Sequence, residues 1–195
     1  MLSSVEFFRP FSLSGTCGSG TIGGVAVEWL RLSLSLRDYE PPRALVAPPK
    51  GIELSSLQEW GDTASHRRSI YELNKTCSAD IPDRGEFFRY EEYEPLRFEA
   101  AGVRPDGFVL AFDETEVVGL CQLTCPPGRR WAFIEMTGVL PAYRRQGLAT
   151  AMKLEALVAA KSWGCSEVRT FHHPDNKAII AANRALGFRD ADFDV

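Results

Sequence analysis

The stretch from residue 108 to residue 139 leaves the chain few structural options. Short apolar runs, separated by a polar turn and by a proline-rich turn, occupy residues 108–112, 117–123 and 131–139. Runs of this length between turn signals are typical of β-strands. The pattern therefore predicts an antiparallel meander, with Gly138 as a bulge near the end of its third strand.

Helical patterns flank this meander on both sides. Residues 145–161 are apolar over much of the helix circumference, and their alanines are small enough to allow close packing on a sheet. The sequence predicts further helices at residues 62–75, 90–101 and 176–186, and further strands at residues 51–54 and 168–171. Together these elements predict an α/β domain with a mixed sheet.

The first 50 residues have a different composition. They are rich in Ser, Gly and Pro, and two Pro-Pro pairs bound the stretch that ends this region. The chain of 195 residues is long enough for one domain and an additional piece. We therefore predict a flexible N-terminal extension or linker at residues 1–50 and a single domain at residues 51–195.

Charge, hydropathy and cysteine content exclude several classes of protein. The net charge of −4 gives no reason to expect a nucleic-acid partner or binding to an anionic membrane surface. No apolar run reaches the ~20 residues that a membrane-spanning helix needs. The five cysteines are an odd number at irregular spacings, so a disulfide framework is not expected. These features predict a cytoplasmic protein that binds neither nucleic acid nor membrane.

A basic, glycine-containing run separates the third meander strand from the helix that follows it. The run is Arg144-Arg145-Gln146-Gly147-Leu148-Ala149. A glycine at the start of a helix lets a ligand approach the backbone, and the exposed N–H groups attract an anion such as a pyrophosphate. The simpler alternative is a basic helix entry without a ligand.

Two motifs in this half of the chain resemble one family. The run Thr137 to Ala149 is similar to the acyl-CoA-binding motif of GNAT-type N-acetyltransferases, whose Gln/Arg-x-x-Gly-x-Gly/Ala pattern matches at Arg144, Gly147 and Ala149. The run from Asn176 to Phe188 resembles the second motif of that family, an Asn that opens a helix ending in Leu-Gly-Phe. The resemblance implies a GNAT-like mixed central β-sheet flanked by helices, with a poorly structured N-terminal extension.

The same resemblance implies where a donor such as acetyl-CoA would bind. The backbones of Gly138 and Val139 would pair with the pantetheine arm, and Asn176 would bind the donor from the opposite side of the cleft. The residues that would hold the pyrophosphate are Arg144, Arg145, Gln146, Gly147, Leu148, Ala149 and Thr150. No metal is expected.

The implied reaction is direct attack of an amine on the thioester, which requires a base. Glu135 on the third meander strand is the predicted base, and an ordinary solvent-facing strand residue is the alternative. Many family members carry a Tyr at the position of Asn183, so the usual proton donor for the departing thiolate is absent. His172, His173 or water remain as donors.

These expectations predict an acyl-CoA-dependent N-acyltransferase that acetylates an amine of a small molecule or a peptide. The alternatives are a catalytically weak acyl-CoA-binding regulatory module and a nucleotide-binding protein that uses residues 18–23. An acidic cluster at Glu86, Glu91, Glu92 and Glu94 would favour a cationic acceptor. Because the chain stops soon after Phe188, we also expect an open sheet edge, pairing in a homodimer, or an incomplete acceptor site.

Overall fold

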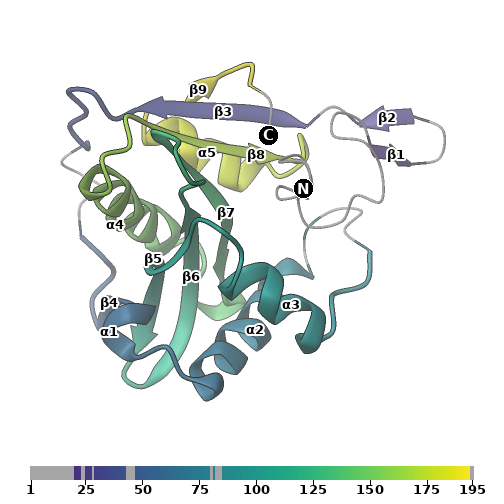
Figure 1. Cartoon of the computed structure of the whole chain (residues 1–195), viewed down its shortest axis with the longest axis vertical. Coiled ribbons are helices and arrows are strands. Elements are labelled where there is room, and N and C mark those ends of the chain that lie inside the picture. Colours follow the sequence, from purple (N-terminus) through teal and green to yellow (C-terminus); the bar gives the residue numbers. More distant parts are fainter. Residues whose placement is uncertain are drawn as a thin grey trace.

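A seven-stranded mixed sheet forms the centre of the protein (Figure 1). The computed structural model describes residues 20–22, 25–27, 29–42, 47–79, 81 and 85–193. The strand order is β4-β5-β6-β7-β8-β3-β9. The strands are β3 (Leu30–Ser35), β4 (Ile52–Ser56), β5 (Val103–Asp113), β6 (Glu116–Thr124), β7 (Trp131–Val139), β8 (Glu167–His172) and β9 (Arg189–Asp190). A separate two-stranded sheet pairs β1 (Gly20–Ile22) with β2 (Val25–Val27).

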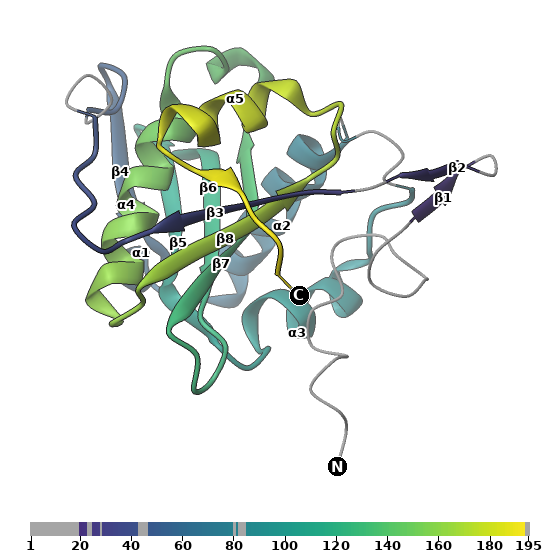
Figure 2. The ribbon, with the colours of Figure 1, turned by 90° about the horizontal axis from the view of Figure 1, so that it is seen from above.

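Helices cover both faces of the sheet (Figure 2). One face carries α1 (Leu57–Trp60), α2 (Ala64–Ser78) and α3 (Tyr90–Phe98), and the other carries α4 (Leu148–Ser162) and α5 (Lys177–Ala185). A 3-10 turn, η2 (Pro141–Tyr143), joins β7 to the segment that leads into α4. No helix in the described residues is long and apolar enough to cross a membrane.

The alternation of side chains along β5 explains why the sheet has a core on each face. Phe108 and Leu110 pack with α1, α2 and α3, whereas Val109 and Ala111 pack with α4. All four side chains are almost fully buried. Successive side chains of a strand point to opposite faces, so one strand supplies both cores. The predicted meander is confirmed, because β5, β6 and β7 pair antiparallel in sequence order.

The bulge in the third meander strand lies at Glu135, so the prediction of a bulge at Gly138 is wrong. Gln122 pairs with Met136 and Leu123 with Ile134, which leaves Glu135 as the extra residue of β7. Gly138 has another role. A Cβ atom there would lie 2.6 Å from Cβ of Cys77, so glycine allows α2 to pack closely against β7.

Strand β3 corrects the prediction that residues 1–50 form a flexible extension. Residues 30–35 pair antiparallel with β8 along its whole length, and β9 pairs with the other edge of β3. Leu32, Leu34 and Leu36 are 0%, 6% and 3% exposed. Every second residue of this stretch is a leucine, so its apolar side chains all reach the core. The serines, glycines and prolines around it hide this signal in the composition.

The position of β3 also bears on the expected open edge. The edge of β8 that faces away from β7 pairs with β3, and β9 follows as a strand of two residues. The sheet position beside β8 is therefore filled by a segment from the N-terminal part of the chain. Of the glycine motif at residues 18–23, Gly20–Ile22 form β1, and the other positions lie outside the described residues.

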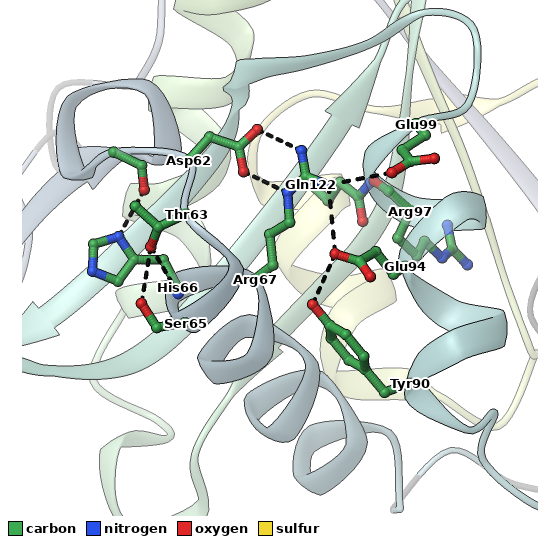
Figure 3. Close-up of polar contacts among 11 residues, drawn as sticks. Asp62, Thr63, Ser65, His66, Arg67, Tyr90, Glu94, Arg97, Glu99 and Gln122 are labelled. Atoms are coloured by element: carbon green, nitrogen blue, oxygen red, sulfur yellow. Dashed lines mark hydrogen bonds and ion pairs between the residues drawn. The ribbon is translucent and has the colours of Figure 1, made fainter.

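An ion-pair network joins the start of α2 to α3 (Figure 3). Arg67 Nε lies 2.6 Å from Asp62 Oδ1, and its NH1 lies 3.6 Å from Glu94 and 3.5 Å from Glu99. The hydrogen bond from Arg67 lowers the pKa of Asp62. The helix expected at residues 62–75 begins at Ala64, because Thr63 caps it and accepts from the N–H of His66 at 3.2 Å. The network holds α2 and α3 together on one face of the sheet.

Substitution of Leu32 tests whether β3 is part of the folded domain. Leu32→Ala removes a fully buried side chain, so we expect it to lower the free energy of unfolding by about 2–5 kcal/mol. Ser35→Ala at the exposed end of the same strand is the control, with an expected change within about 0.5 kcal/mol. Urea unfolding followed by circular dichroism measures both. Equal stability of the two variants would contradict the structural role of β3.

Candidate functional site

The parallel strands β7 and β8 pair only at their beginnings. The pairs are Trp131 with Glu167, Ala132 with Val168 and Phe133 with Arg169. Beyond these residues, β7 remains paired with β6 on its other edge and β8 remains paired with β3, so the two strands move apart. A cleft of about 500 Å³ opens between their carboxyl ends. It is also lined by the segment that leads into α4, the start of α5, and side chains from α2 and α3.

The segment that leads into α4 has the backbone of an anion site. Arg145 and Gly147 have φ angles of 62° and 83°, which interrupt the helical geometry, so α4 begins at Leu148. No side chain caps the first turn of α4, and the first N–H groups of a helix have no acceptor within it. Arg144 Nε donates to the carbonyl of Val139 at 2.9 Å and fixes this segment to the end of β7.

Most of the residues predicted to bind the donor lie at this cleft. They are Gly138, Val139, Arg144, Arg145, Gly147, Leu148, Ala149, Thr150 and Asn176. Gln146 is the exception, because its side chain is exposed and donates from Nε2 to the carbonyl of Ala142 at 3.3 Å. Asn176 directly precedes α5, and its side-chain amide does not cap the start of that helix. The structure therefore brings residues of the 137–149 motif and of the 176–188 motif together around the same cleft.

Glu135 faces the cleft, and its carboxylate is held from two sides. Its Oε2 lies 3.1 Å from NH1 of Arg97, and its Oε1 accepts from Oγ1 of Thr124 at 2.8 Å. The side chain is 15% exposed, so it is not an ordinary solvent-facing strand residue. Glu135 is the extra residue of the bulge in β7, and a bulge changes the direction in which a side chain points. Arg97 was missed by the sequence analysis, because its partner lies on a distant strand.

His172, which lines the cleft, forms a polar pair with the buried Asn183. Asn183 is fully buried, and its Nδ2 lies 2.6 Å from Nε2 of His172. Burial, and to a lesser extent the charge of Lys153, lower the pKa of His172 to about 3. The imidazole is therefore neutral near pH 7 and holds no extra proton for a departing thiolate. Asn183 is committed to this contact.

Lys153 is a buried charge that the sequence analysis did not single out. It lies in the middle of α4, is 0% exposed, and its Nζ has no hydrogen-bond partner among the described residues. Burial lowers its pKa to about 8. A single lysine in a run of apolar residues was the available signal. Its charge acts to lower the pKa of Cys121 and of His172, so Lys153 lies close to both side chains beneath the cleft.

Trp29 lies at the cleft although it comes from the segment that was expected to be flexible. Its ring contacts Phe171 and His173 edge-on, with centroid distances of 5.4 and 5.8 Å. It directly precedes β3, whose pairing with β8 brings the indole to this position.

The acidic cluster of Glu86, Glu91, Glu92 and Glu94 does not line the cleft. Glu92 pairs with Arg89, and Glu94 accepts from the hydroxyl of Tyr90.

Comparison with known proteins agrees with this geometry. The sequence profile of the acetyltransferase (GNAT) family matches residues 67–188, which include both sides of the cleft. The chain belongs to this family. It is 40% identical over 134 residues to an aminoglycoside N(6′)-acetyltransferase type 1 of Acinetobacter haemolyticus, covering 68% of this chain and 79% of that protein. It covers less than half of the length of two other curated relatives that it matches.

Solved structures show the same fold. A GCN5-related N-acetyltransferase from Sphaerobacter thermophilus superposes with a TM-score of 0.66 at 20% identity, covering 84% of this chain and 48% of that one. AAC(6′)-Iy, solved with the bisubstrate analogue CoA-S-monomethyl-acetylneamine, gives a TM-score of 0.55 at 17% identity, covering 74% and 95%. The GNAT-like mixed sheet expected from the two motifs is thus confirmed.

The stability of the protein should depend on pH through Lys153. Its pKa is about 8 in the folded state and 10.5 for an unperturbed lysine, so the unfolded state binds more protons between these values and stability rises with pH there. Lys153→Met should remove this rise and stabilise the protein at pH 7 by roughly 3 kcal/mol. Lys161→Met, at an exposed position of the same helix, is the control. Urea unfolding at pH 7 and pH 10 measures the effect, and parallel pH dependence in wild type and Lys153→Met would contradict it.

Proposed function

We propose that this protein is an acyl-CoA-dependent N-acyltransferase that transfers an acetyl group from acetyl-CoA to an amine of a small molecule. The observation that carries the proposal is the uncapped start of α4, which lies at the open end of a cleft between splayed parallel strands. Helix N-termini of this kind bind phosphate groups. Arg144 and Arg145 add two positive charges beside it.

The edge of β7 that lines the cleft suits the extended arm of the donor. Beyond Phe133, this edge pairs with no strand in the part of the chain that the structure describes. An extended ligand can add to a free strand edge through backbone hydrogen bonds. We infer that the pantetheine arm lies along Gly138 and Val139, with its pyrophosphate at residues 144–150 and Asn176 on the opposite wall.

The transfer forms a C–N bond and breaks the C–S bond of the thioester. An amine with a pKa near 10.4 is mostly protonated at neutral pH, so a base must remove its proton. We assign this role to Glu135, which acts directly or through a water. Arg97 and Thr124 hold the carboxylate at the cleft wall. Because His172 is neutral and Asn183 is not an acid, water protonates the departing thiolate, as expected for a thiol with a pKa of about 8.5.

The relatives and the cleft support a small-molecule amine as the acceptor. The Acinetobacter haemolyticus relative is named for acetylation of an aminoglycoside, which is a small molecule that carries several amines. In this chain, the acceptor amine would approach Glu135, whose carboxylate attracts an ammonium group. A peptide amine is the second acceptor class, and a panel of both kinds in a thiol-release assay separates them. We expect the protein to act in the cytoplasm, where acetyl-CoA is available.

Gly147 provides a test of donor binding. A residue with a Cβ is strained at a φ of 83°, so Gly147→Val should displace the first N–H groups of α4 and weaken acetyl-CoA binding at least about tenfold. Gly128→Val is the matched control, because Gly128 also has a positive φ, of 73°, and no neighbour within 4 Å, but lies outside the cleft. Isothermal titration calorimetry measures both variants. Equal affinities for acetyl-CoA would overturn the proposed pyrophosphate site.

Glu135 provides a test of catalysis. Glu135→Gln keeps the shape of the side chain but removes the base, so turnover should fall by about 10²-fold while acetyl-CoA affinity stays unchanged. Glu155→Gln at an exposed position of α4 is the control. Thiol release and calorimetry measure the two quantities. Full turnover in Glu135→Gln would remove Glu135 from the mechanism, and donor binding without any turnover in the wild type would favour the regulatory alternative.

A further inference from the structure

Two cysteines that are distant in the sequence lie side by side near the end of the sheet at which β7 and β8 are paired. The Sγ atoms of Cys125 and Cys165 are 3.5 Å apart. Cys125 directly follows β6, and Cys165 lies between α4 and β8. A disulfide requires an S–S distance of about 2.05 Å, so a small approach of the two thiols would bring them within bonding distance.

The backbones around both thiols are fixed by hydrogen bonds. The N–H of Cys125 donates to Gly102 at 2.9 Å, and the N–H of Cys165 donates to Ala160 at 3.0 Å. The two connections are also bonded to each other, because the N–H of Ser166 donates to Arg130 at 2.7 Å. Backbone hydrogen bonds therefore hold both cysteines in the positions at which their thiols are in contact.

The two thiols differ in exposure. Cys125 is half-buried and open to solvent, whereas Cys165 is 6% exposed. Burial, together with the neighbouring Cys125, raises the pKa of Cys165 to about 12. Cys125 is therefore the thiol that a reagent in solution meets first, and Cys165 is the thiol positioned to react second.

A fixed positive charge lies beside this pair. The guanidinium of Arg104 is held by Asp106 at 3.0 Å and stacks over the ring of Trp163 at 4.7 Å. Its charge acts on both Cys125 and Cys165. A nearby cation favours the thiolate, which is the form that attacks a disulfide.

The position of the pair relates it to the cleft. Cys165 lies two residues before β8, and Cys125 begins the turn that leads into β7. These are the ends at which β7 and β8 are paired, and neither cysteine lines the cleft. A covalent bond between them would tie the turn that joins β6 to β7 to the segment that leads into β8.

We propose that Cys125 and Cys165 are a reversible redox pair that closes into a disulfide in the presence of a low-molecular-weight disulfide. The thiolate of Cys125 attacks the reagent and forms a mixed disulfide, releasing one thiol. Cys165 then loses its proton and attacks Cys125, forming the protein disulfide and releasing the second thiol. Two protein thiols are oxidised and one reagent disulfide is reduced to two thiols, so the exchange is balanced.

The disulfide should stabilise the fold without blocking the site. It would close a loop of the chain between two elements of the sheet, which restricts the unfolded state. We expect the midpoint of thermal unfolding to rise by roughly 5 °C or more on oxidation and to return after reduction. This inference does not depend on the proposed function, because it is read from mass and stability rather than from turnover.

The experiment uses the full chain and oxidised glutathione as the probe. Intact mass should fall by about 2 Da as two thiol hydrogens are lost, and peptide mapping should join the peptides of Cys125 and Cys165. Dithiothreitol should reverse both changes. Cys125→Ser and Cys165→Ser should abolish the mass loss, whereas Cys121→Ser, at a fully buried cysteine of β6, should retain it. Arg104→Gln should slow disulfide formation several-fold.

Several results would overturn the proposal. These are a stable glutathione adduct on the wild type as the end product, a mapped disulfide that joins other cysteines, or an unchanged mass. Mapping of the wild-type protein decides the question even if a serine variant fails to fold. A disulfide between Cys125 and Cys165 that lowers the unfolding midpoint would contradict the expected stabilisation.

Discussion

The short parallel pairing between β7 and β8 determines where the cleft lies in this protein. The two strands pair over Trp131–Phe133 and Glu167–Arg169, and beyond these residues β7 pairs only with β6 and β8 only with β3 among the described strands. Where the two parallel strands separate, no other strand of the described residues fills the gap, and each of the two pairs with a different neighbour on its other edge. Helix α4 begins at the open end of that gap. The strand separation and the helix start together create one cleft with a free strand edge along one side and free N–H groups at its mouth.

The sequence predicted those features that depend on near neighbours. Short apolar runs between turns along residues 108–139 were sufficient for the meander, and the run from Arg144 to Ala149 was sufficient for the helix entry. Features that depend on distant partners were missed or misplaced. Arg97 is an ordinary helix residue until β7 brings Glu135 to it, and the bulge at Glu135 depends on the register with β6. Strand β3 was missed because its partner, β8, is far along the chain.

The charges at the cleft are arranged in two ways. Arg97 and Glu135 are both mostly buried and paired, so each compensates the cost of removing the other from water. Lys153 is fully buried, its Nζ has no hydrogen-bond partner in the part of the chain that the structure describes, and burial weakens its affinity for a proton. His172, beside it, is neutral for related reasons. The wall that bears Glu135 therefore holds two opposite charges that pair with each other, whereas burial disfavours the charge of Lys153 beneath the cleft.

The placement of β3 has a consequence for how the protein reaches its fold during synthesis. Leu30 and Arg31 are synthesised well before their partners His172 and Phe171, which lie far along the chain. Until then, the leucines of β3 have no strand to pair with, while β4 to β7 can already form their meander. Pairing between distant segments carries a large loop-closure cost and slows folding. The sheet is therefore complete only once β3 has joined β8, and the same pairing gives the cleft the wall that contains Trp29.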